Sequence, residues 1–150
     1  MLKRIFPLIL VLMLMLTGCG KSDADTPNNT YEKITMSEGL ARMKSDENYI
    51  LLDVRRADEF EVGHIPGAVN LPNEEIGTEE IPSLPDKAQT IYIYCRSGNR
   101  SKQAADKLLA LGYTNLIEFG GIIDYTGELE YGKQRRQNNE ICMSNLRLYL

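Results

Sequence analysis

One short loop of the sequence concentrates residue types that can do chemistry together. Residues 95–101 read CRSGNRS and directly follow the apolar run 90–94, TIYIY. Cysteine supplies a nucleophilic thiol and the two arginines supply positive charge, while glycine and asparagine tolerate the left-handed backbone of a tight turn. The loop therefore predicts an anion site around Cys95, in which the anion is a bound oxyanion or the thiolate itself.

The elements on either side of this loop would hold it in place. The run before Cys95 is rich in β-branched and aromatic residues, which is typical of a strand. From Arg100 onward apolar residues recur at helical spacing, and Gly112 predicts the end of that helix. A helix that begins at the loop directs backbone N–H groups and the positive end of its dipole at one point, and such a position can lower the pKa of a cysteine.

The rest of the chain alternates between helix and strand patterns. A capping box of Thr35 and Glu38 predicts the start of a helix. Further helical turns are predicted over 57–62, 74–80 and 122–125, and strands over 49–54, 68–71, 90–94 and 115–119. The run 49–54, YILLDV, has no polar alternation, which is typical of a strand buried on both faces. The pattern predicts an α/β fold with a central, mainly parallel sheet flanked by helices.

Three segments resemble the single-domain rhodanese-like sulfurtransferases. They are 51–72 (LLDVRRADEFEVGHIPGAVNLP), 91–101 (IYIYCRSGNRS) and 119–129 (FGGIIDYTGEL). The resemblance implies transfer of sulfane sulfur from a donor such as thiosulfate or polysulfide, through a persulfide, to a thiol or cyanide, with no cofactor and no metal. It differs at Tyr125, where the family often has tryptophan, a change that we expect to affect packing only.

Carried onto this sequence, the resemblance implies a role for each residue of the loop. Cys95 would be the nucleophile and persulfide carrier, with no histidine base required. The side chains of Arg96 and Arg100 would attract the anionic donor. The backbone of the loop would cradle the sulfur, and the residues that form this cradle are Arg96, Ser97, Gly98, Asn99 and Arg100. The residues that would support the site are Asp53, Arg55 and Ser101. The single histidine, His64, lies in the GHIPGA turn, where we expect a structural role, and Asp58 and Glu59 are expected only to begin a helix.

The first twenty residues have the layout of a bacterial lipoprotein signal. A basic start (MLKR) precedes an almost wholly apolar run over 5–16, which is too short to span a bilayer of roughly 30 Å as a helix. Residues 16–19, LTGC, resemble a lipobox, which implies cleavage before Cys19 and a lipid on its thiol. An ordinary signal peptide or a short anchor is the alternative.

These patterns divide the chain into four parts. We predict a signal peptide over 1–18, the lipidated Cys19 with a flexible tether over 19–32, a rhodanese-like domain over 33–132, and a tail of unassigned role over 133–150. The expected location is extracytoplasmic, with the protein anchored to the bacterial cell membrane by lipid. In the tail, Cys142 could resolve a persulfide or disulfide at Cys95, although a stray thiol is the simpler interpretation.

Charge and loop length limit the partners and the alternative functions. The net charge of −4 argues against a nucleic-acid partner. The expected partners are a small anionic sulfur donor, a thiol acceptor such as a thioredoxin-like protein, and the membrane. A non-catalytic module that binds a protein or senses sulfur at the membrane surface stays open. A phosphatase or arsenate-type enzyme is more distant, because its loop has five residues between cysteine and arginine, whereas Arg96 to Asn99 make four here.

Overall fold

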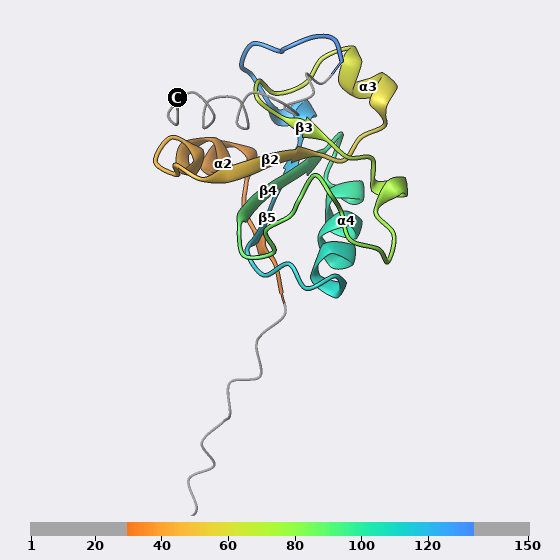
Figure 1. Ribbon diagram of the computed structural model, residues 1–150. Helices are drawn as coiled ribbons and strands as arrows, with labels where there is room; N and C mark the ends of the chain where they lie inside the picture. The colour runs from red at the N-terminus through yellow and green to blue at the C-terminus, as the bar shows by residue number, and fades with distance from the viewer. Residues whose placement is uncertain (1–29, 134–150) are drawn as a thin grey trace, which may run out of the picture.

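The computed structural model describes residues 30–133 of the chain. Five strands form one sheet in the order β1-β5-β4-β2-β3 (Figure 1). Each neighbouring pair of strands is parallel, which confirms the predicted α/β fold and makes the sheet wholly parallel. The strands are β1 (Glu32–Lys33), β2 (Tyr49–Asp53), β3 (Val69–Asn70), β4 (Thr90–Cys95) and β5 (Leu116–Gly121).

The helices connect these strands and begin where local sequence signals place them. They are α2 (Met36–Met43), α3 (Ala57–Glu61) and α4 (Asn99–Ala110), with the short 3-10 helices η1 (Asn73–Glu75) and η2 (Ile122–Asp124). The predicted capping box starts α2, because the side chains of Thr35 and Glu38 each accept a hydrogen bond from the other residue's backbone N–H. Gly112 has a φ of +89° just after α4, as a helix-ending glycine requires. None of the helices within 30–133 has the length and hydrophobicity needed to span a bilayer.

Alternation along β4 separates the two faces of the sheet. Ile91, Ile93 and Cys95 belong to the core on the α4 side, and Tyr92 and Tyr94 belong to the core on the α2 side. Figure 1 shows α4 and α2 on opposite sides of the sheet. Burial on both faces explains why the strand sequences lack polar alternation. It also places the Cys95 side chain at the carboxyl end of the middle strand, on the side of α4.

The prediction of a helix over 74–80 is wrong. The structure has only the single turn η1 there, because the backbone of Ile76 is extended, with φ of −76° and ψ of 101°. The side chains of Ile76, Ile81 and Leu84 are buried in the core on the α4 side. An extended path lets this segment reach the core at several points, and that burial outweighs the polar helix pattern of its sequence.

The sheet contains one short strand that the sequence analysis did not predict. Strand β1 was not predicted, because its two residues are polar and exposed and carry no hydrophobic pattern. Glu32, which was assigned to the tether, pairs with Ile117 of β5. The other predicted elements occur within two residues of their expected bounds. The predicted signal peptide, Cys19 and Cys142 lie outside the described residues.

Candidate active site

Cys95 ends β4 and is buried, with 1% of its surface exposed. The backbone N–H of Gly98 donates a hydrogen bond of 3.1 Å to Sγ of Cys95. Gly98 has a φ of +93°, in the left-handed region that favours glycine, and this conformation turns the chain back over the sulfur. Helix α4 begins at the next residue, so its N-terminal end lies beside the sulfur.

The remaining loop residues differ in how they are held. The side chains of Arg96, Ser97 and Asn99 are exposed around the loop. The backbone of the loop packs directly on the end of β5, because a Cβ atom added to Gly121 would lie 2.3 Å from the carbonyl oxygen of Arg96. That carbonyl also accepts a hydrogen bond of 3.3 Å from the N–H of Ile123. The loop is therefore supported from β5 as well as by its own turn.

Arg100 forms a bidentate ion pair with Glu59 of α3. Nη1 of Arg100 lies 2.6 Å from Oε2 of Glu59, and Nη2 lies 2.9 Å from Oε1. The hydrogen bond from Arg100 is the main cause that lowers the pKa of Glu59 to about 2, and the same bond raises the pKa of Arg100. Sequence analysis missed Glu59 as a site residue because it lies 41 positions before Arg100. The role of Arg100 in attracting a donor stays a prediction. Its positive charge is partly balanced by the carboxylate of Glu59.

Asp53 and Arg55 form a buried ion pair where β2 ends. Arg55 Nη2 lies 2.6 Å from Oδ2 of Asp53, and it also donates a hydrogen bond of 2.8 Å to the carbonyl of Gly63. Burial alone would lower the pKa of Arg55, but the hydrogen bonds and charge of Asp53 raise it above its usual value. This ion pair agrees with the supporting role expected for the two residues, and it ties β2 to the following turn.

Ser101 and Glu118 meet behind the cysteine loop. Ser101 Oγ lies 2.6 Å from Oε1 of Glu118, and both residues are buried. The same oxygen of Glu118 accepts a hydrogen bond of 3.1 Å from the N–H of Gly120. Sequence analysis named Ser101 but not Glu118. The signal that could have found it is a single acidic residue between apolar neighbours, Ile117 and Phe119, in a predicted strand.

His64 and Tyr125, which the sequence analysis also named, pack against neighbouring residues of the fold. His64 is buried, its ring stacks on Phe60 with centroids 3.6 Å apart, and its Nδ1 donates a hydrogen bond of 2.9 Å to the carbonyl of Phe60. These contacts agree with a structural role for His64. Tyr125 packs against the core on the α2 side, and its hydroxyl donates to the carbonyl of Glu128 at 3.1 Å.

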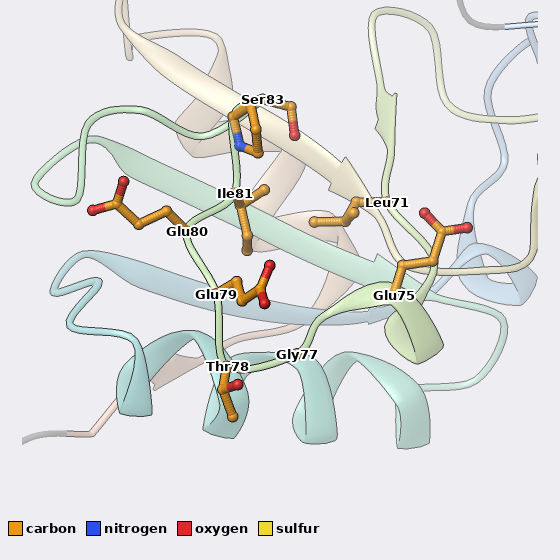
Figure 2. Close-up of a pocket in the computed structure, with 9 residues that line it drawn as sticks. Leu71, Glu75, Gly77, Thr78, Glu79, Glu80, Ile81 and Ser83 are labelled. Atoms are coloured by element: carbon orange, nitrogen blue, oxygen red, sulfur yellow. The ribbon is translucent and has the colours of Figure 1, made fainter.

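A pocket of about 410 Å³ lies elsewhere, along the segment that follows η1. Figure 2 shows Leu71 and Ile81 pointing toward one another across it, while Glu80 points outward. No residue of the 95–101 loop lines this pocket, so it is separate from the cysteine site. Within residues 30–133, no group of three or more His, Cys, Asp or Glu side chains could hold a metal ion.

The fold and the loop together define an α/β protein whose cysteine ends the middle strand of a parallel sheet, at the start of a helix. Residues 36–128 match the model of the rhodanese-like domain, and the chain belongs to this family. The thiosulfate sulfurtransferase PspE of Escherichia coli is 36% identical over 73 residues, which cover 49% of this chain and 70% of that protein.

Two further comparisons agree with this family. The putative sulfur carrier protein YrkF of Bacillus subtilis is 35% identical over 99 residues, which cover 65% of this chain, and the chain spans about half of that protein's length (52%). Among solved structures, a rhodanese with anions from E. coli matches with a TM-score of 0.51 and 34% identity, over 56% of this chain and 99% of that one. The rhodanese-like fold and a sulfurtransferase family are therefore established for this chain.

Proposed function

We propose that this protein is a sulfurtransferase that carries sulfane sulfur as a persulfide on Cys95, from a donor such as thiosulfate or polysulfide to a thiol or cyanide. The observation that carries the proposal is the hydrogen bond from the Gly98 N–H to Sγ of Cys95, at the N-terminal end of α4. A fixed backbone donor and a helix dipole both favour a negative sulfur at that position. The relatives named as sulfurtransferases support the same chemistry.

The reaction would proceed in two displacements at sulfur. The Cys95 thiolate attacks the outer sulfur of thiosulfate, the S–S bond of the donor breaks, and sulfite leaves with the bonding electrons. The thiolate of an acceptor then attacks the outer sulfur of the Cys95 persulfide, takes that sulfur, and releases Cys95 as a thiolate. In both steps negative charge develops on sulfur within the loop, where the Gly98 N–H can stabilise it.

Positive charge near the loop would draw in the anionic donor. Arg96 is exposed beside the cysteine, and Arg100 lies at the start of α4, held by Glu59. The solved E. coli rhodanese is described with anions, which supports an anion site in this fold. A thioredoxin-like protein is a suitable acceptor, because its reactive thiolate can attack the outer sulfur of a persulfide.

Intact-protein mass spectrometry of the full chain in detergent tests this function. We expect thiosulfate or polysulfide to add one sulfur atom and cyanide to remove it. Cys95→Ser should not gain sulfur, whereas Cys142→Ser should gain it normally, because the persulfide forms on Cys95. A folded protein with a reactive Cys95 thiol that gains no sulfur from either donor would refute the proposal and favour a binding or sensing module. Hydrolysis of an aryl phosphate that depends on Cys95 would favour a phosphatase-type enzyme.

We further propose that Cys19 carries lipid and anchors the domain to the outer face of the cell membrane. The support is the basic start, the apolar run and the LTGC segment of the sequence. Residues 20–29 would then separate the lipid from the folded part of the chain. Expression in bacteria fed a labelled fatty acid should label the wild type but not Cys19→Ala. Equal labelling of both proteins, or a wild type recovered from the medium without lipid, would contradict the anchor.

A further inference from the structure

Glu118 is a buried carboxylate that the transfer chemistry does not use. It lies in β5 with 4% of its surface exposed. None of the ion pairs formed within residues 30–133 includes it. Its contacts are instead neutral donors on two elements, the hydroxyl of Ser101 in α4 and the N–H of Gly120 at the end of β5. Burial of an acid without an ion-pair partner costs free energy of folding, so a role for the acid at this position is worth seeking.

The distances show where the hydroxyl hydrogen of Ser101 goes. Oγ of Ser101 lies 2.6 Å from Oε1 of Glu118 and 3.0 Å from the carbonyl oxygen of Gly98. A separation of about 2.6 Å is typical of a hydroxyl that donates to a carboxylate, so the shorter contact takes the hydrogen. The Gly98 carbonyl keeps the N–H of Lys102, at 3.4 Å, as its helical donor. Glu118 therefore holds the first turn of α4 against β5.

This contact lies directly behind the donor to the cysteine sulfur. Oε1 of Glu118 would be 3.7 Å from a Cβ atom added to Gly98, whose N–H donates to Sγ of Cys95. On its other side the carboxylate holds Gly120, next to the glycine that packs on the Arg96 carbonyl. The two donors to Glu118 thus lie on either side of the loop. Ser101 is in the helix that follows Gly98, and Gly120 precedes the glycine that packs on the Arg96 carbonyl.

We propose that Glu118 is a positioning residue for the cysteine loop, which acts through Ser101 and Gly120 to keep the Gly98 N–H directed at Sγ of Cys95. The inference rests on the proposed function, because the benefit of a fixed donor is to stabilise the Cys95 thiolate that leaves when sulfur is transferred. The alternative role for a buried acid at this place is electrostatic, since a negative charge disfavours a nearby thiolate. The two roles predict opposite effects of removing the acid.

The test is the rate of alkylation of Cys95 by iodoacetamide in the full chain, measured near neutral pH and at about pH 10, where thiols ionise without help. Cys142→Ser serves as the background, so that only Cys95 and Cys19 remain, and the site of labelling is read by peptide mass spectrometry. The charged groups that face the loop stay unchanged except where stated. They are Arg96, Lys102, Glu118, the Arg100–Glu59 pair, Glu74, whose charge acts on Arg100, and the Asp53–Arg55 pair.

Three variants separate the two roles. Ser101→Ala keeps the charge of Glu118 but removes the link, and we expect the neutral-pH rate to fall about tenfold while the rate at high pH changes less than about twofold. Glu118→Leu should lower the neutral-pH rate similarly, although it removes a negative charge. Glu118→Gln should keep the rate within about twofold, because its amide oxygen can still accept both hydrogen bonds. Ser45→Ala is the matched control, since the Ser45 hydroxyl likewise lies within hydrogen-bond distance of the carbonyl three residues earlier, at 2.9 Å from that of Arg42, but lies on the exposed surface and forms no hydrogen bond with a carboxylate of residues 30–133.

An unchanged neutral-pH rate in Ser101→Ala would overturn the proposal. So would faster alkylation in both Glu118 variants, which would show that the acid acts through its charge. If Glu118→Leu does not fold, as judged by circular dichroism, Ser101→Ala and Glu118→Gln still decide between the roles. Alkylation uses no sulfur donor, so this result is independent of whether Cys95 can be loaded with sulfur.

Discussion

The ion pair between Glu59 and Arg100 joins α3 to the helix that follows the cysteine loop, and Glu59→Gln tests its contribution. Glutamine keeps the size of the side chain and removes its charge. Arg100 then lies beside a neutral amide instead of a carboxylate, so the folded state loses a charge-assisted, bidentate contact. We expect a lower free energy of unfolding at neutral pH, with the domain still folded.

The structure sets the size of the effect. The pKa of Glu59 falls from 4.5 to about 2, mainly because of the hydrogen bond from Arg100 and with a smaller contribution from the backbone N–H of Arg56. At about 1.4 kcal/mol for each pKa unit, the shift corresponds to an upper limit of about 3 kcal/mol. About a quarter of each side chain is exposed, 24% for Arg100 and 27% for Glu59, so solvent screens the pair. We therefore expect Glu59→Gln to lower the free energy of unfolding by about 1–2 kcal/mol.

The effect should depend on pH in a defined direction. The pKa of Glu59 is lower in the folded protein than in the unfolded chain, so the stabilisation is present above the unfolded value of 4.5 and is lost as the pH falls toward about 2. The difference between wild type and Glu59→Gln should be constant above about pH 5.5 and should shrink to less than half near pH 3.

Urea unfolding followed by circular dichroism measures this difference at each pH. The matched control is Asp58→Asn, at the neighbouring position of the same helix, where the pair between Asp58 and Arg56 is largely exposed (63% and 65%) and removal of the charge should have no measurable effect. A difference for Glu59→Gln that stays the same at pH 3 as at neutral pH would refute the electrostatic argument. An equal loss of unfolding free energy in Asp58→Asn would show that any charge removed from this part of α3 destabilises the domain, whether or not it pairs with Arg100.

Two further changes probe the supports of the site. Arg55→Ala leaves the Asp53 carboxylate fully buried without its cation, so we expect a loss of about 3–5 kcal/mol in urea unfolding, and a loss below about 1 kcal/mol would contradict the importance of the pair. Gly121→Ala places a Cβ atom 2.3 Å from the Arg96 carbonyl, so the loop must move, and sulfur loading measured by mass spectrometry should fall at least about tenfold. Gly77→Ala, where an added Cβ meets nothing within 4 Å, is the control, and equal loading of both variants would show that the loop tolerates displacement.

The local sequence predicted most of the architecture, because its signals are short-range. The Thr35–Glu38 capping box, the apolar run of β4 and the glycine after α4 each depend on neighbouring residues, and the structure has a helix start, a strand and a helix end at these places. The segment after η1 was mispredicted for the opposite reason. Its extended path depends on which apolar side chains reach the core, and that depends on elements distant in the chain.

By itself, the sequence determined the chemistry available to this protein: one cysteine between a strand pattern and a helix pattern, with two arginines and a glycine beside it. Only the tertiary structure decided how that chemistry is supported. It brings Glu59 to Arg100 across 41 positions and Glu118 to Ser101 across 17, which no local spacing indicates. The physical reason is that a parallel sheet places the carboxyl ends of strands side by side, so residues that support one loop come from connections far apart in the chain.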